Sequence, residues 1–364
     1  MNELERIQAL ILESTPVLGR EIAYILDSLG RVLACDITAV EDVPCTDISA
    51  VDGFAVQCGA LEGASKINPV VLKVIGESPA GRPCGATVGR GEAVRIMTGG
   101  LVPDGADSVV KKEDAEDRGE VVACVNNPGI GGNIRVRGEA LRKGDLVLRA
   151  GEVVGAVEVC KLASMRRAHV HVHQKPVVAI LSTGDELSDF HEPPSPGKTM
   201  CSNLYGMAAQ VLETGAVPLL LGMVPDDPEE QKTLLAEGLR ADVVITSGGM
   251  SRGKYDLVRE TLRAMDVEIK FRNIALKPGK AAVFGAINGT LVFGFPGNPS
   301  ASMISFEQFV KPALLKMMGR RSVSDARESR FSAIDSFRLD LMGCNCHSRA
   351  SLVPCRKPES GSSP

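Results

Sequence analysis

Several features are scarce in this chain of 364 residues, and each scarcity excludes a class of function. There is no Trp and there are only three Tyr, so nucleic-acid bases would find few aromatic side chains on which to stack. The net charge of −4 provides no general electrostatic attraction for nucleic acid. No apolar run reaches the roughly 18 residues needed to span a bilayer. We therefore expect neither a nucleic-acid partner nor a membrane partner.

Other missing motifs narrow the chemistry. The ten Cys are scattered without paired CxxC sets, which argues against a zinc site and favours the cytoplasm as the compartment. The N-terminal sequence MNELERIQAL is acidic and amphipathic, unlike a signal or transit peptide. A Walker A loop and a GxGxxG motif are both absent, which weighs against ordinary NTPase or dehydrogenase chemistry.

One stretch, ADVVITSGGMSRGKYD (residues 241–256), stands out for what it contains. Residues 242–246 have the Val and Ile content of a short buried strand. The strand is followed by Ser247-Gly248-Gly249, where the two glycines have no side chain to keep a ligand away from the backbone. A helical pattern begins after Asp256. A strand, a Gly-rich loop and a helix in this order predict an anion site at the carboxyl end of a parallel sheet.

The order of patterns predicts an α/β multidomain fold. Helical spacing covers residues 2–12 and 19–29, and short β-runs with Gly and Pro follow from about 70 to 148. Strands and helices then alternate from 176 to 319, which is typical of a doubly wound, mostly parallel sheet. We expect four domains: an N-terminal linking domain with a helical segment (1–44 with 145–174), an inserted β-rich domain (45–144), a βαβ domain (175–319) and a C-terminal remnant (320–364).

Polar residues follow the predicted parallel strands and should meet at one edge of the sheet. Carboxylates bind a hard cation such as Mg²⁺, while Lys and backbone N–H groups bind phosphate oxygens. The sequence therefore indicates a phosphate-bearing substrate bound with Mg²⁺. The candidates at this edge are Thr183, Asp185, Glu186, Asp226, Asp227, Ser247, Asp256, Lys277, Lys280, Asn298 and Ser300.

Purely structural roles remain open for several of these residues. Asp227 precedes Pro228 and is a good helix N-cap, and KPGK (277–280) is compatible with a solvated turn. The loop acid Asp52 is followed by Gly53, as in many solvated turns. The NIRVRGEA segment predicts a strand with Arg135 and Arg137 on one face. His169, His171 and His173 also alternate along one strand face, where an exposed face is favoured over a metal site.

Eight motifs occur in an order that resembles a known family. They are SAVDGFAV, RIMTGG, NIRVRGE, STGDEL, DDPE, SGGMSRGKYD, KPGK and FPGNPSAS. Their order and spacing are similar to those of the molybdopterin molybdenumtransferase (MoeA) family, which includes the E domain of gephyrin. The resemblance covers about residues 1–319. It implies an enzyme of molybdenum cofactor biosynthesis that inserts molybdate into adenylylated molybdopterin (molybdopterin-AMP) and releases AMP with the help of Mg²⁺.

The resemblance also implies a βαβ domain of the MogA/MoaB type that binds molybdopterin, and a homodimer whose active site lies between subunits. Asp52 and Thr98 match the side of the site that the second subunit supplies. Glu186, Asp227 and Asp256 match catalytic residues that also bind the metal. Lys277 and Lys280 match further catalytic residues on the βαβ side of the site. The matched loops that hold the pterin phosphate and nucleotide contain Ser247, Gly248, Gly249, Ser251, Pro296, Gly297, Asn298, Pro299 and Ser300.

The chain departs from the family pattern in two places. Position 140 is Ala where the family has an acid, and the side chain of Glu139 would point elsewhere. After Gly319 only 45 residues remain, with the Ser- and Pro-rich CNCHSRASLVPCRKPESGSSP at the end. We expect a truncated, partly disordered C-terminal domain.

Two alternatives stay open beside molybdate insertion. The departures leave open a scaffold protein that binds molybdopterin without turnover. A tungstate insertase is the other alternative, because tungstate has the same charge as molybdate and nearly the same size. The partners implied by the resemblance are a molybdopterin adenylyltransferase and the maturation proteins of molybdenum enzymes.

Overall fold

The computed structural model describes residues 3–248, 257–272 and 282–321. These residues form two compact units. The first contains residues up to Val40 together with those from Gly144 onward, and the second runs from Glu41 to Lys143. Within the described ranges no helix is long and apolar enough to cross a membrane.

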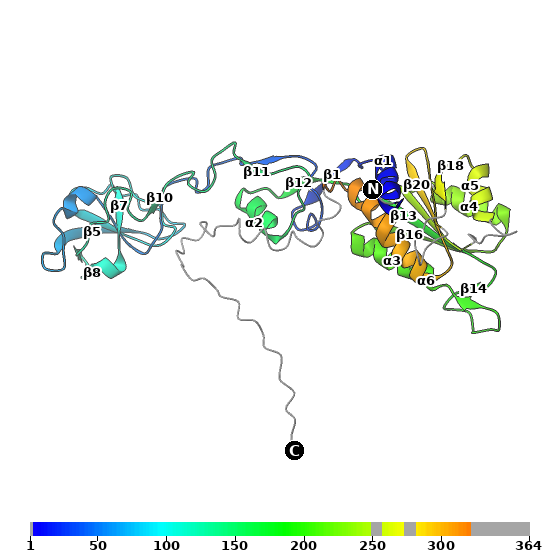
Figure 1. Cartoon of the computed structure of the whole chain (residues 1–364). Coiled ribbons are helices and arrows are strands. Elements are labelled where there is room, and N and C mark those ends of the chain that lie inside the picture. Colours follow the sequence, from blue (N-terminus) through cyan, green and yellow to red (C-terminus); the bar gives the residue numbers. More distant parts are fainter. Residues whose placement is uncertain (1–2, 249–256, 273–281, 322–364) are drawn as a thin grey trace, which may run out of the picture. The chain divides into compact units, whose positions relative to one another are not determined.

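A six-stranded sheet is the centre of the first unit (Figure 1). Its strand order is β16 (Val217–Val224), β13 (Val177–Thr183), β17 (Val243–Ser247), β20 (Thr290–Phe295), β19 (Val283–Ile287) and β18 (Glu268–Arg272). The first four strands are parallel neighbours, whereas β19 and β18 are antiparallel. The mostly parallel sheet predicted from the strand–helix alternation is confirmed.

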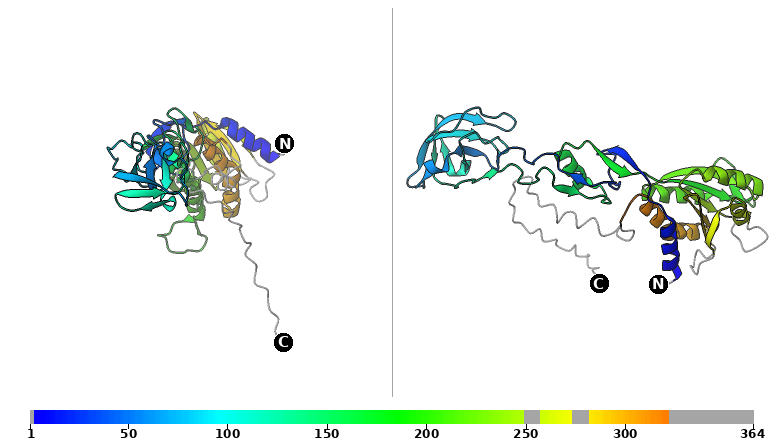
Figure 2. Two further views of the ribbon diagram at one scale, coloured as in Figure 1. Left: turned by 90° about the vertical axis from the view of Figure 1, so that its left-hand side faces the viewer. Right: turned by 90° about the horizontal axis from the view of Figure 1, so that it is seen from above.

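Helices cover both faces of this sheet (Figure 1 and Figure 2). Along β13, Val178 and Ile180 pack into one core, and Ala179 and Leu181 pack into the other. Because both faces are buried, the strands are continuously apolar rather than alternating. The first core lies under α1 (Glu3–Ser14), α3 (Ser202–Thr214), the π-helical segment η3 (Phe306–Val310) and α7 (Lys311–Met317). Helix α6 (Pro299–Ser305) leads into η3 and packs against α3. The second lies under α4 (Pro228–Gly238) and α5 (Leu257–Ala264).

The remainder of the first unit corrects one prediction. The helix expected over residues 19–29 is wrong, because residues 20–24 form β1 (Arg20–Tyr24), which pairs antiparallel with β12 (His169–His173). Only Ala23 is buried in β1, and pairing with a distant strand overrides the local helical spacing. Helix α2 (Ala156–Ser164) precedes β12, and β2 (Ile37–Thr38) pairs with β11 (Leu146–Leu148).

The three alternating histidines lie on β12 as predicted, with the buried Val170 and Val172 between them. Among the described residues no group of three His, Cys, Asp or Glu side chains is placed to hold a metal ion.

The second unit is β-rich, as predicted. Its main sheet has the order β7 (Ser108–Lys111), β4 (Gly53–Val56), β6 (Glu92–Ile96), β5 (Val70–Ser78), β9 (Val121–Cys124) and β8 (Ala115–Asp117). The shorter elements of the second unit are β3 (Ile48–Ser49), β10 (Ile134–Arg135), η1 (Cys58–Leu61) and η2 (Lys112–Asp114). The first unit contains two further short strands, β14 (Leu187–Ser188) and β15 (Thr199–Met200). Since β10 ends at Arg135, the strand face expected to carry both Arg135 and Arg137 does not form. The four domain boundaries stay a prediction, and the remnant lies outside the described residues after position 321.

Candidate functional site

The carboxyl ends of β13 and β17 and the turn after β20 border a cavity of about 140 Å³. Strands β13, β17 and β20 are direct parallel neighbours, so the segments that follow them emerge at the same edge. The cavity is lined by Ser182, Thr183, Glu186, Leu187, Thr199, Met200, Cys201, Ser202, Asn203, Ser247, Gly248, Gly297 and Pro299. Several candidates from distant parts of the sequence therefore lie together.

Gly248 brings the ends of two neighbouring strands close together. Its φ of 99° is unfavourable for residues with a side chain, and its N–H donates to the carbonyl of Phe295 at 3.0 Å. A Cβ at this position would lie 2.2 Å from the carbonyl oxygen of Thr183. Only glycine fits, and this explains the glycine that follows the central strand.

Asn203 links two of the loops, although the sequence reasoning did not identify it. Its Nδ2 donates to Oγ of Ser247 at 2.6 Å and to the carbonyl of Gly297 at 2.9 Å. Its position in the first turn of α3, next to a parallel strand edge, is the only sequence signal that could have indicated this role. Asn203 therefore fixes the Ser247 and Gly297 loops relative to each other.

In the part of the chain that the structure describes, three buried polar atoms at the cavity lack hydrogen-bond partners that a ligand could supply. Ser182 Oγ, Thr183 Oγ1 and Asn203 Oδ1 are buried and have no hydrogen-bond partner among the described residues. Such atoms are costly to leave unsatisfied. The hydroxyls can donate or accept, whereas the amide oxygen only accepts, so the cavity suits a ligand that carries both donors and acceptors.

The turn after β20 is held by caps. Asn298 accepts a hydrogen bond from the N–H of Ala301 at 3.1 Å and is the N-cap of α6. Pro299 occupies the first helical position, where its missing N–H costs nothing. The hydroxyl of Ser302 donates to the carbonyl of Pro296 at 2.5 Å. Ser300 is exposed at the start of the same helix.

Acidic residues gather beside the cavity. The backbone N–H of Asp226 donates to Oδ1 of Asp185 at 3.1 Å. Burial and the neighbouring charges of Asp185 and Glu186 raise the pKa of Asp226. One of its oxygens, Oδ1, is buried without a hydrogen-bond partner among the described residues. Three carboxylates, those of Asp185, Glu186 and Asp226, therefore lie close enough to influence one another at this edge of the sheet.

We expect Asp226→Asn to stabilise the protein at neutral pH. A carboxyl whose folded-state pKa is raised opposes folding once it ionises. Its penalty is absent below the ordinary value of 3.8 and develops as pH rises through the folded-state pKa. Chemical unfolding should give a higher free energy of unfolding for the variant at pH 7 and little difference near pH 3. The exposed carboxylate substitution Asp27→Asn is the control, and a variant less stable than wild type at pH 7 would contradict this account.

Asp227 caps a helix in the structure. Its Oδ1 accepts hydrogen bonds from the N–H groups of Glu229 at 3.0 Å and Glu230 at 2.9 Å. The predicted N-cap of α4 is confirmed, and Asp227 is not among the residues that line the cavity.

A pair of substitutions separates the cap from any role of the charge. Asp227→Ala should lower the free energy of unfolding by about 1 kcal/mol, because the cap is lost. Asp227→Asn keeps an oxygen acceptor and should remain close to wild type in a urea unfolding experiment. If Asp227→Asn instead destabilised the protein as much as Asp227→Ala, the N-cap explanation would be wrong.

Asp52 and Thr98 interact with each other in the second unit. The N–H and the hydroxyl of Thr98 both donate to Oδ1 of Asp52 at 2.8 Å. These two hydrogen bonds, the backbone one first, hold the pKa of Asp52 below its usual range, and the charge of Lys112 adds to the effect. The ammonium of Lys112 lies 3.8 Å from Oδ2 of Asp52. A carboxylate in this setting stays ionised.

Position 140, where the family has an acid and this chain has Ala, also lies in the second unit. Ala140 is half-buried and its N–H donates to the carbonyl of Val43 at 2.9 Å. Glu139 is exposed, with its carboxylate 3.6 Å from the guanidinium of Arg135. Glu139 is therefore engaged in a pair of its own.

Five other predicted site residues, Gly249, Ser251, Asp256, Lys277 and Lys280, lie outside the described residues. The site roles predicted for all candidate residues stay predictions.

Two protein-family models together match nearly the whole described chain. Residues 2–165 match the MoeA N-terminal region (domain I and II). Residues 179–316 match a probable molybdopterin binding domain.

Curated relatives and solved structures extend these matches. A molybdopterin molybdenumtransferase of Nostoc sp. is 36% identical over 303 residues, which cover 82% of this chain and 70% of the relative. A molybdopterin molybdenumtransferase of Bacillus subtilis is 39% identical over 293 residues, which cover 79% of this chain and 68% of the relative. A crystal structure of a molybdopterin biosynthesis MoeA protein from Pyrococcus horikoshii superposes with a TM-score of 0.78 at 33% identity, covering 88% of this chain and 81% of that one.

Proposed function

Because the chain belongs to the molybdopterin molybdenumtransferase family, we propose that it inserts molybdate into adenylylated molybdopterin and releases AMP, a transferase step of molybdenum cofactor biosynthesis. The observation that carries the proposal is the sheet-edge cavity. There the family's Gly-rich and PGNP loops meet around buried polar atoms that have no partner among the described residues.

The cavity can recognise the substrate through complementary hydrogen bonding. A pterin ring carries both N–H donors and ring acceptors. The oxygen of Asn203 would accept from a ring donor, and the hydroxyls of Ser182 and Thr183 would pair with either kind of group. The loops around Ser247, Gly248 and Pro296–Ser300 would hold the phosphate and nucleotide, with Gly249 and Ser251 of the same motif.

Mg²⁺ is the cofactor we propose for this site, with Glu186, Asp227 and Asp256 as its ligands. The donor type fits, because Mg²⁺ prefers carboxylate oxygens. Burial first, and then the charges of Asp185 and Glu186, raise the pKa of Asp226, and a bound cation would offset the contribution of those charges. Asp185 and Asp226 would act as secondary acids. When bound, Mg²⁺ would neutralise charge on the phosphoanhydride, with Lys277 and Lys280 assisting on the phosphate oxygens.

The second half of the proposed site comes from another copy of the chain. Asp52 and Thr98 of one subunit would face the βαβ edge of its partner in a homodimer. The proposal includes a cytoplasmic setting, a molybdopterin adenylyltransferase that supplies the substrate and maturation proteins that receive the product.

A scaffold role is the second candidate, and Ala140 favours it because the nearest acid, Glu139, pairs with Arg135. Equilibrium binding of adenylylated molybdopterin, followed by a single-turnover assay with molybdate and Mg²⁺, distinguishes the two. Insertion predicts that bound nucleotide is converted to AMP. Tight binding with no AMP release would favour the scaffold, and release with tungstate in preference to molybdate would identify a tungstate insertase.

A further inference from the structure

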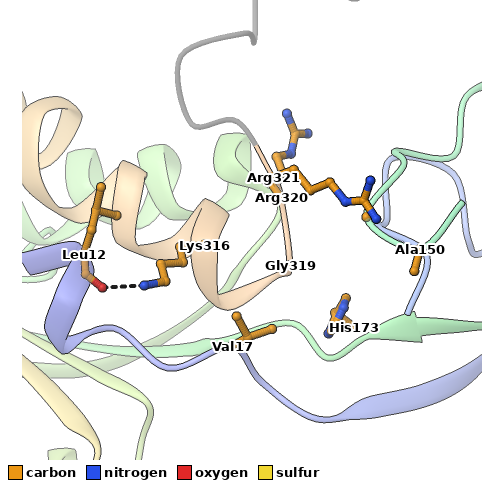
Figure 3. Close-up of a pocket in the computed structure, with 9 residues that line it drawn as sticks. Leu12, Val17, Ala150, His173, Lys316, Gly319, Arg320 and Arg321 are labelled. Atoms are coloured by element: carbon orange, nitrogen blue, oxygen red, sulfur yellow. Dashed lines mark hydrogen bonds between the residues drawn. The ribbon is translucent and has the colours of Figure 1, made fainter. Parts of the chain in front are cut away.

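A second cavity, of about 500 Å³, lies in the first unit and shares no residue with the sheet-edge cavity (Figure 3). It is formed by the last turn of α1 and the segment after it, the loop between β11 and α2, the end of β12, and the end of α7 with the residues that follow it. Its lining residues are Leu12, Val17, Ala150, Gly151, His173, Lys316, Gly319, Arg320 and Arg321. The lining contains three cationic side chains and a histidine but no carboxylate.

One of the cations has a structural partner. Lys316 Nζ donates to the carbonyl of Leu12 at 2.6 Å, in the last turn of α1 (Figure 3). A cation there satisfies an end carbonyl and complements the helix dipole. This contact explains Lys316, and two further N–H groups of its ammonium remain for a ligand.

The two arginines have no such explanation. Within the described part of the chain, neither Arg320 nor Arg321 forms a side-chain hydrogen bond or ion pair. Burial lowers the pKa of Arg320, and no neighbouring charge opposes that effect. Partly burying the guanidinium of Arg320 without a counter-ion costs free energy, which a bound anion would recover, whereas Arg321 is exposed and free to reach the same anion.

Two glycines shape the walls on which these side chains rest. Gly151 has φ +85°, and a Cβ there would lie 2.6 Å from Nε of Arg321. Gly319 has φ +79°, and a Cβ there would lie 2.3 Å from Cδ2 of His173. The Arg321 side chain and the His173 ring therefore lie directly against backbone, an arrangement that any other residue at either position would disturb.

We propose that this cavity binds a phosphate dianion, either free or as the phosphate of a small phosphomonoester, through Arg320 and Arg321. Guanidinium groups match the oxygens of a tetrahedral phosphate in a bidentate manner. The volume of about 500 Å³ falls among small-molecule sites, so it admits more than the phosphate alone. The proposal does not rest on the insertase activity.

Chemical labelling of the wild-type full-length chain tests the site directly. Phenylglyoxal modifies accessible arginines, and peptide mass spectrometry would report Arg320 and Arg321 separately from the rest. Inorganic phosphate in one arm and AMP in another should slow labelling of both arginines several-fold, while labelling of exposed Arg240 stays unchanged. Protection by AMP alone would assign the phosphomonoester, and protection by both would assign the phosphate group itself.

Calorimetric titration of phosphate gives the matched variant test. The double substitution R320M/R321M should weaken phosphate binding at this site tenfold or more, whereas R240M, which also removes one exposed charge, should not. Equal labelling with and without either ligand would overturn the proposal. So would unchanged phosphate binding in a folded R320M/R321M protein. Since labelling uses the wild-type chain, a variant that fails to fold leaves the proposal testable.

Discussion

Replacing Gly248 by Ala should destabilise the protein by about 3 kcal/mol or more and abolish substrate binding at the sheet edge. The added Cβ would lie 2.2 Å from the carbonyl oxygen of Thr183, and this backbone oxygen cannot move without disturbing β13. The φ of 99° adds strain of its own. Urea unfolding measures the stability loss, and equilibrium binding of adenylylated molybdopterin measures the loss of the site.

Gly289 provides the matched control for this substitution. Its φ of 90° is similar, but a Cβ at this position has no atom within 4 Å. Gly289→Ala should therefore cost only the backbone strain, about 1–2 kcal/mol, and leave substrate binding intact. Equal destabilisation by the two substitutions would show that close packing against Thr183 is not what requires glycine at position 248.

Two substitutions on opposite sides of the proposed site should each stop metal insertion. Asp52→Ala removes the acceptor of both Thr98 hydrogen bonds, and Glu186→Gln removes a charge beside the cavity at nearly constant volume. We expect each to reduce AMP release about 100-fold or more, the usual scale for losing an electrostatic group of an active site. Stability should change little, because the Asp52 side chain is 43% exposed and Glu186 lies at the sheet edge.

Mixing the two inactive variants tests the proposed dimer. If each site takes Asp52 from one subunit and Glu186 from the other, a heterodimer contains one site with both residues intact. Random exchange of equal amounts should therefore restore about a quarter of the wild-type activity. Full activity of either single variant would contradict the assignment of its residue. Two inactive variants that form heterodimers but remain inactive when mixed would place both residues in the same subunit's site.

The fold was largely predictable because its strongest signals are local in sequence. Apolar runs such as Val177–Leu181 and Val243–Ile245, separated by amphipathic helices, are typical of a parallel sheet buried on both faces. The failure at residues 19–29 has the opposite cause. Strand β1 exists through pairing with β12, which lies about 150 residues away by their numbering, and no local pattern encodes that contact.

In the candidate site too, residues with a local sequence signal were predictable, and residues whose role depends on distant contacts were not. Gly248 was predictable because a strand followed by glycine at a parallel edge has a direct steric meaning. Asn203 was missed because its role depends on bringing α3 beside the ends of β17 and β20. For Asp227 the structural explanation that was left open, a helix cap, is confirmed, whereas a role in metal binding awaits the activity of Asp227→Asn.

The most direct test of the central claim is AMP release from adenylylated molybdopterin by the purified full-length protein with Mg²⁺. The assay should compare molybdate, tungstate and sulfate at equal concentrations. The insertase account predicts release that depends on molybdate, continues over several turnovers and is lost in Asp52→Ala. Stable nucleotide binding with no release for any oxyanion would contradict it and identify the chain as a binding member of the family.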